Sequence, residues 1–184
     1  MRPRAHIASP FALALAVALG ALGCNGRRGS GGAPNEAVMA TLGTVRALHH
    51  QADVFENAGD FARARGAVER VLQLSFPPEM AEREDLRLDA TGRLAELDLR
   101  LGDADGCIAR ATQGLAEARR ESVLQARLMM VRGQCASALA DRAQAAQNAS
   151  LATRHRERAL SDLEQSIAVN TRVLRRALGP QGAR

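Results

Sequence analysis

The sequence contains no lysine, tryptophan or tyrosine, and only 2% of its 184 residues are aromatic. This poverty of aromatic side chains argues against a β-sheet protein, because strands are enriched in aromatic and β-branched residues. Three cysteines are too few for a disulfide-rich scaffold. A hydrophobic share of 46% is too high for a disordered chain. The abundant residues are alanine, leucine, arginine and glutamate, which all favour helices.

The absence of lysine shapes the charge of the chain. All 25 basic residues are arginines, and against 20 acidic residues they give a formal net charge of +5. Most of these arginines alternate with acids, which is typical of solvated helix faces. No aromatic side chains accompany them to stack on the bases of a single strand. We therefore expect no nucleic-acid binding, and we attribute the exclusive use of arginine to a GC-rich genome.

The first 24 residues differ from the rest of the chain. A short basic segment, 1–4, precedes a run of 13 apolar or small residues, 11–23. This run is too short for a membrane-spanning helix, which needs about 20 residues, and it is typical of a secretory signal peptide. It ends at Ala21-Leu22-Gly23-Cys24, which resembles the lipobox of bacterial lipoprotein precursors. The leucine stands one place closer to the cysteine than the family prefers.

The resemblance implies that the signal peptide, 1–23, is removed and that Cys24 is acylated. Two or three acyl chains would anchor the protein stably. The glycine-rich segment 24–36 would then be a flexible tether between the membrane and the folded part. The implied location is the bacterial cell envelope, facing the periplasm, and Asn25 favours the outer membrane. An ordinary cleaved signal peptide and a retained anchor are the alternatives.

The remaining chain has helical spacing of its apolar residues, and we expect one helical domain over 37–178 with a short tail, 179–184. Gly59-Asp60 and Gly102-Asp103 interrupt the pattern twice, since glycine favours a helix end and aspartate a helix start. Two consecutive prolines at 77 and 78 separate the two halves. A third, less regular round follows, whose second apolar stretch contains Leu160, Leu163, Ile167 and Leu174.

Segment 48–77 resembles a tetratricopeptide repeat, and 91–118 is similar to a second, weaker copy. A third copy would begin around Gly133 with a turn at 140–141. Alternatively, Ala159, Leu163 and Ile167 lie on its second helix, which would leave 141–158 as an insertion or an extended helix. The two glycine–aspartate pairs are 43 residues apart (102 − 59), which exceeds the usual repeat of about 34 residues. The resemblance implies an all-α, short solenoid of antiparallel helix pairs. An irregular helical bundle is the alternative. The residues that carry the first copy are Leu48, Ala52, Phe55, Gly59, Asp60, Phe61, Ala64, Val68 and Pro77.

In the tetratricopeptide family, partners usually lie along the concave face that the first helix of each repeat builds. Carried over to this sequence, the resemblance implies a groove for a protein or peptide. Each polar residue in it could equally be the solvated side of an amphipathic helix. The implied groove residues are His49, Asp53, Asn57, Glu96, Arg100, Arg127 and Gln134.

Other candidate sites are weak. His49 and His50 are adjacent, so their side chains cannot converge on one metal ion in a helix. Cys107 and Cys135 would survive cleavage, and we favour two small buried side chains over a disulfide, although an oxidising compartment permits the bond. We find no nucleophile–base pair, phosphate-binding loop or paired carboxylates. The sequence therefore predicts no catalytic residue, no metal and no cofactor.

These observations together predict a non-enzymatic, membrane-anchored scaffold for protein–protein interactions in the bacterial cell envelope. The resemblance implies assembly of an envelope machine as one role. The alternatives are a structural envelope lipoprotein that contacts cell-wall polymers and a lipid-anchored helical bundle that binds a ligand.

Overall fold

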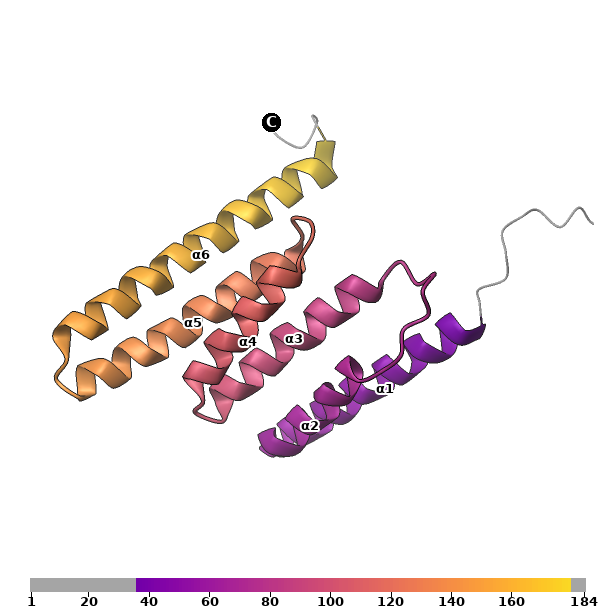
Figure 1. Ribbon diagram of the computed structural model, residues 1–184, viewed down its shortest axis with the longest axis horizontal. Helices are drawn as coiled ribbons and strands as arrows, with labels where there is room; N and C mark the ends of the chain where they lie inside the picture. The colour runs from indigo at the N-terminus through magenta and orange to yellow at the C-terminus, as the bar shows by residue number, and fades with distance from the viewer. Residues whose placement is uncertain (1–35, 180–184) are drawn as a thin grey trace, which may run out of the picture. The chain divides into compact units, whose positions relative to one another are not determined.

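The computed structural model describes residues 36–179, and this part of the chain is helical with no strand (Figure 1). The expected all-α class is therefore confirmed for the described residues. The predicted signal peptide, Cys24, the tether up to residue 35 and the tail from residue 180 lie outside them. The helices are α1 (Glu36–Asn57), α2 (Phe61–Leu72), α3 (Arg83–Arg100), α4 (Ala104–Glu117), α5 (Val123–Ala145) and α6 (Ala149–Leu178).

The six helices belong to one unit of the chain, and each packs against the next in sequence. In addition, α3 packs against α5, while α6 contacts α5 alone and lies at one edge of the helical array (Figure 1). Two buried apolar clusters form the core. One joins α1, α2 and α3 around Val68, Leu94 and Leu97, and the other joins α3, α4 and α5 around Leu128 and Val131. Helix α3 therefore contributes to both clusters and links them.

The two glycine–aspartate turns end and start helices as the sequence predicts. Gly59 has φ +74° and Gly102 has φ +83°, a backbone region that suits glycine. The following aspartate caps the next helix, because Asp60 accepts a hydrogen bond from the backbone N–H of Arg63 at 3.0 Å. Asp103 accepts one from Gly106 in the same way at 2.9 Å. These contacts explain why α2 and α4 begin where they do.

A third turn of the same kind lies at Gln147-Asn148. Gln147 has φ +60°, and the Asn148 side chain accepts a hydrogen bond from the backbone N–H of Leu151 at 3.0 Å. The expected turn at 140–141 is wrong, because both residues lie inside α5. The alternative is right that Ala159, Leu163 and Ile167 lie on the next helix, which is α6. Segment 141–158 itself is neither an insertion nor one helix, since it contains the end of α5, this turn and the start of α6.

Helix α6 packs on α5 through small and polar residues. Its buried positions are Ala152, Ala159, Asp162, Ser166 and Val169. The two helices approach closely at Gly133, where an added Cβ would lie 3.1 Å from the Ala159 carbonyl oxygen. The Ser166 hydroxyl donates to the Ala126 carbonyl at 2.7 Å. This face is thus specified by close approach and hydrogen bonding.

The apolar stretch expected in the third round is mostly exposed. Leu160, Ile167 and Leu174 are 61%, 65% and 56% exposed, and Leu163 is partly buried. The physical reason is that α6 has one neighbouring helix and meets it with its small-residue face. Separately, none of the helices within 36–179 is both long and apolar enough to cross a membrane.

Candidate partner-binding face

Arg93 on α3 links that helix to α1. Its guanidinium donates to Glu56 Oε1 at 2.6 Å and to Asp53 Oδ1 at 2.5 Å, and it also donates to the backbone carbonyl of His49 at 3.2 Å. The side chain is only 14% exposed. The network therefore ties the predicted groove residues His49 and Asp53 to an arginine that the sequence reasoning missed.

Arg127 on α5 makes the equivalent connection to α3. It binds Glu96 through both carboxylate oxygens, at 2.9 and 2.8 Å, and Asp89 at 2.6 Å. The structure thus brings together Glu96 and Arg127, which were both expected at the groove. The missed partner Asp89 lies four residues before Arg93, and Arg93 lies three before Glu96. This helical spacing is the sequence signal that could have found them.

A cavity of about 250 Å³ opens between α1, α3 and α5. It gathers three of the predicted groove residues, Glu96, Arg100 and Gln134, with an apolar part beside them. The other four predicted residues do not line it, namely His49, Asp53, Asn57 and Arg127. The complete lining is Glu56, Arg93, Glu96, Leu97, Leu99, Arg100, Met130 and Gln134.

The polar groups around this cavity differ in how far they are engaged. Glu96 and Arg93 are held in the ion pairs above. The Arg100 guanidinium lies 5.7 Å from the centre of the Phe61 ring. The exposed side chains of Gln134 and Asn57 make no hydrogen bond to any other residue within 36–179. The cavity therefore presents one exposed cation, held only by an aromatic ring, and one amide without a hydrogen-bond partner in the described residues.

Burial and ion pairing shift the pKa of three groups in this network. Burial lowers the pKa of His49 below its usual value, and this outweighs the nearby Asp89 carboxylate. Burial alone would lower the pKa of Arg93, but hydrogen bonds to Glu56 and Asp53 raise it overall. The hydrogen bond to Glu96 raises the pKa of Arg127. The arginines thus stay charged, while His49 is held neutral at pH 7.

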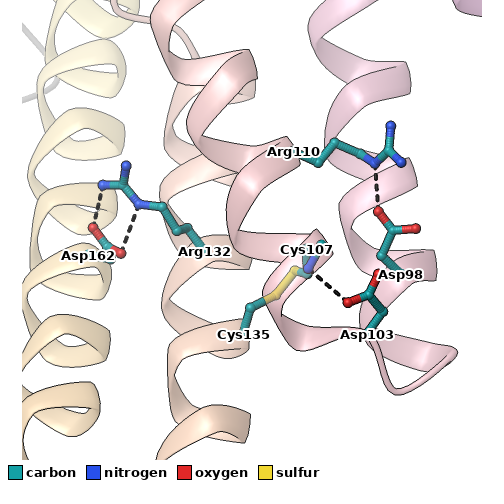
Figure 2. The surroundings of a disulfide bond; sticks show 8 residues. Asp98, Asp103, Cys107, Arg110, Arg132, Cys135 and Asp162 are labelled. Carbon is teal, nitrogen blue, oxygen red and sulfur yellow. Dashed lines mark hydrogen bonds and ion pairs between the residues drawn. A yellow bond between two sulfur atoms is a disulfide. The ribbon is translucent and has the colours of Figure 1, made fainter.

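Two buried carboxylates connect the other helices. Asp98 on α3 is 3% exposed and accepts from Arg65 of α2 at 2.7 Å and from Arg110 of α4 at 2.6 Å. Asp162 on α6 binds Arg132 of α5 through both oxygens, with the longer contact at 2.9 Å (Figure 2). Because these charges are buried and paired, they serve the packing of the helices.

Cys107 and Cys135 form a disulfide bond between α4 and α5 (Figure 2). The preference for two unbonded cysteines was wrong. Both residues do occupy buried small-residue positions, as expected, but their Cα atoms are 6.1 Å apart, which lies in the range that a disulfide spans. The sequence could not decide this, because the pairing depends on the distance between two helices.

Within the described part of the chain, no three histidine, cysteine, aspartate or glutamate residues are placed to hold a metal ion. His49 and His50 lie on different sides of α1, one half-buried and the other exposed.

Comparisons with known proteins add no identification. No protein-family model matches the chain, and neither a curated protein nor a solved structure gives a match.

Proposed function

We propose that the protein is a lipid-anchored, non-catalytic scaffold that binds a protein or peptide in the bacterial cell envelope. The observation that carries this proposal is the cavity between α1, α3 and α5, which has polar groups from all three helices and an apolar side formed by Leu97, Leu99 and Met130. Such a mixed surface suits an extended peptide, whose backbone needs hydrogen bonds and whose side chains need apolar contact.

The proposal includes a short solenoid of three helix–turn–helix units that resemble tetratricopeptide repeats. It is supported by the shared geometry of the three turns, each with a positive φ followed by a capping side chain. It is also supported by the packing of α3 on α5 and by the arginine links from α1 to α3 and from α3 to α5. In this arrangement α1, α3 and α5 would form the binding face.

The location in the envelope rests on the lipobox-like sequence before Cys24. The disulfide between Cys107 and Cys135 supports an oxidising compartment, because structural disulfides are rare in proteins that remain in the cytosol. The proposed orientation therefore places the helices in the periplasm, at the outer membrane as Asn25 favours.

The anchor is tested by the intact mass of the full chain isolated from its source. We expect loss of residues 1–23 and a mass increase of two or three acyl chains on Cys24. In a Cys24→Ala variant the acyl mass should be missing. An unmodified mass for the natural chain, with unchanged membrane partitioning of Cys24→Ala, would contradict lipid anchoring.

The binding face is tested by co-purification of partners with the full chain under identical detergent and salt. An Arg100→Ala/Gln134→Ala double variant removes the exposed cation and the amide of the cavity and leaves the arginine networks intact. We expect at least a tenfold lower recovery of the co-purified protein. Arg158→Ala is the matched control, since Arg158 is exposed on α6 and away from this cavity. Equal recovery from all three chains would refute the assignment of the face.

A second candidate function, direct contact with an anionic cell-wall polymer, is favoured by a larger cavity of about 690 Å³ at the start of α3 and the end of α4. Arg83, Arg87 and Arg119 line it and outnumber the two glutamates there, Glu84 and Glu117. None of the three guanidinium groups forms an ion pair with another residue in 36–179. Binding there would be electrostatic, so 0.5 M salt should abolish retention on isolated cell walls. Retention that survives this salt, or survives Arg83→Ala/Arg119→Ala, would exclude this function.

A further inference from the structure

The outer side of α6 carries a stripe of large aliphatic side chains, which we call the α6 stripe: Leu160, Ile167, Leu174 and Leu178. They are 61%, 65%, 56% and 53% exposed, and they make up four of the eight large hydrophobic residues that the described part of the chain exposes. Steps of seven, seven and four residues place them on one side of a helix. Since α6 packs on α5 through small and polar residues, its most apolar surface is the one without a partner.

The α6 stripe is flanked by charges in an ordered way. The residue three places before each stripe member lies beside it on the same flank. These flanking residues are Glu157, Glu164, Thr171 and Arg175. The flank is thus acidic toward the start of the helix and basic toward its end. Within the described residues, neither glutamate nor Arg175 forms an ion pair, so their charges are available.

We propose that the α6 stripe binds the same stripe of a second copy of this chain, in an antiparallel pair with its two-fold axis at Ile167. The equal spacing of Leu160 and Leu174 about Ile167 is what such symmetry requires. Ile167 meets its symmetry mate, and Leu160 meets Leu174 of the other copy. Three of the four stripe members are therefore complementary to themselves, while Leu178 lies opposite the exposed Arg156 of the other copy, whose aliphatic part can cover it.

The flanking charges favour the antiparallel direction. Residue 157 lies opposite residue 177 of the second copy, which places Glu157 about 3 Å along the axis from Arg175 of that copy. In a parallel pair this flank would instead face the opposite flank of the second copy, so Glu157 would not meet Arg175. The two glutamates also disfavour the alternative of an anionic membrane surface, which selects a basic flank.

The size of the contact suits a weak dimer. The four side chains and their flanks would contribute roughly 400–500 Å² from each copy, so the total of about 1,000 Å² lies at the lower limit of specific interfaces. This surface is separate from the cavity between α1, α3 and α5, so the proposal stands independently of the proposed function.

Cysteine cross-linking in the full chain, in its native membrane, tests the pairing and its register. After mild oxidation, Ile167→Cys should give a disulfide-linked dimer as the main product, reversed by reductant. Leu160→Cys alone should stay monomeric, because two copies of this position lie about 21 Å apart along the axis. Leu160→Cys combined with Leu174→Cys should restore the dimer. The unsubstituted chain, treated identically, measures any bridge through Cys24.

Three results would overturn the proposal. A monomeric Ile167→Cys chain would mean that no second copy covers the stripe. The same holds if that chain forms adducts with a different protein or with lipid and none with itself. Equal dimer yields from Ile167→Cys and Leu160→Cys would exclude the antiparallel register. A chemically cross-linked natural dimer that persists in Ile167→Glu would place the contact elsewhere. Gln165→Glu, which adds the same charge on another side of α6, should leave that dimer unchanged.

Discussion

Removing the disulfide between α4 and α5 should lower stability by an amount that the chain length between its cysteines sets. Cys107 and Cys135 are 28 residues apart in sequence. In the loop-closure model, a bridge over such a segment stabilises the folded state by about 3.6 kcal/mol, chiefly by restricting the unfolded chain. Reduction alone should therefore lower the melting temperature by roughly 7–14 °C for a chain of this size.

The assay is urea unfolding followed by circular dichroism, on chains refolded with and without reductant. Refolding is needed because both cysteines are fully buried, so a reductant reaches them only after unfolding. A Cys107→Ala/Cys135→Ala variant separates the bond from the packing, since it should lose the same amount plus about 1 kcal/mol for each missing sulfur. It should also be insensitive to reductant. Equal stability of the oxidised and reduced natural chain would refute the reasoning.

Three further predictions concern packing and charge. Ala64→Trp should lower the free energy of unfolding by about 1–3 kcal/mol, because Ala64 is fully buried between α1, α2 and α3. Ala62→Trp, on the exposed side of α2, should be nearly neutral. Equal melting temperatures of the two variants would contradict this packing. Gly133→Ala should destabilise the α5–α6 contact. Gly66→Ala should stabilise the folded chain by about 0.5–1 kcal/mol, because nothing lies near its added Cβ. A higher melting temperature for both variants would disprove the close approach at Gly133. Because the pKa of His49 is lowered below 6.5 in the folded state, His49 is protonated in the unfolded chain before it is protonated in the folded one. The stability of the fold should therefore decrease as the pH drops below about 6.5. The same dependence of stability on pH in His49→Gln would exclude this cause.

The features that the sequence predicted are local ones. Gly59 and Gly102 signal helix ends through the backbone freedom of glycine, and the aspartate after each glycine signals a cap. The third turn was missed because Gln147 adopts a positive φ without being glycine. The only residue that indicated this turn was Asn148, and asparagine also occurs at many positions that are not helix starts.

The features that the sequence could not settle depend on which helices meet. Helical spacing identified apolar residues on α6, but it cannot tell which side of a terminal helix is covered, and Ile167 is exposed. The resemblance pointed to Glu96 and Arg100 of α3 as groove residues. The sequence could not show that Arg93 binds α1 or that Glu96 pairs with Arg127 of α5, because both contacts depend on how the three helices are arranged in space.

The measurement that tests the central claim most directly is a photo-cross-linking scan of the full chain in its native membrane. A photoreactive residue is placed at Asn57, Arg100 and Gln134 on α1, α3 and α5, and at the exposed Ala62 and Ala109 on α2 and α4 as controls. The account predicts one adduct of the same mass from each of the three positions on α1, α3 and α5, and none from the two control positions. The same adducts from both groups, or no adduct at the three positions, would contradict a partner-binding face.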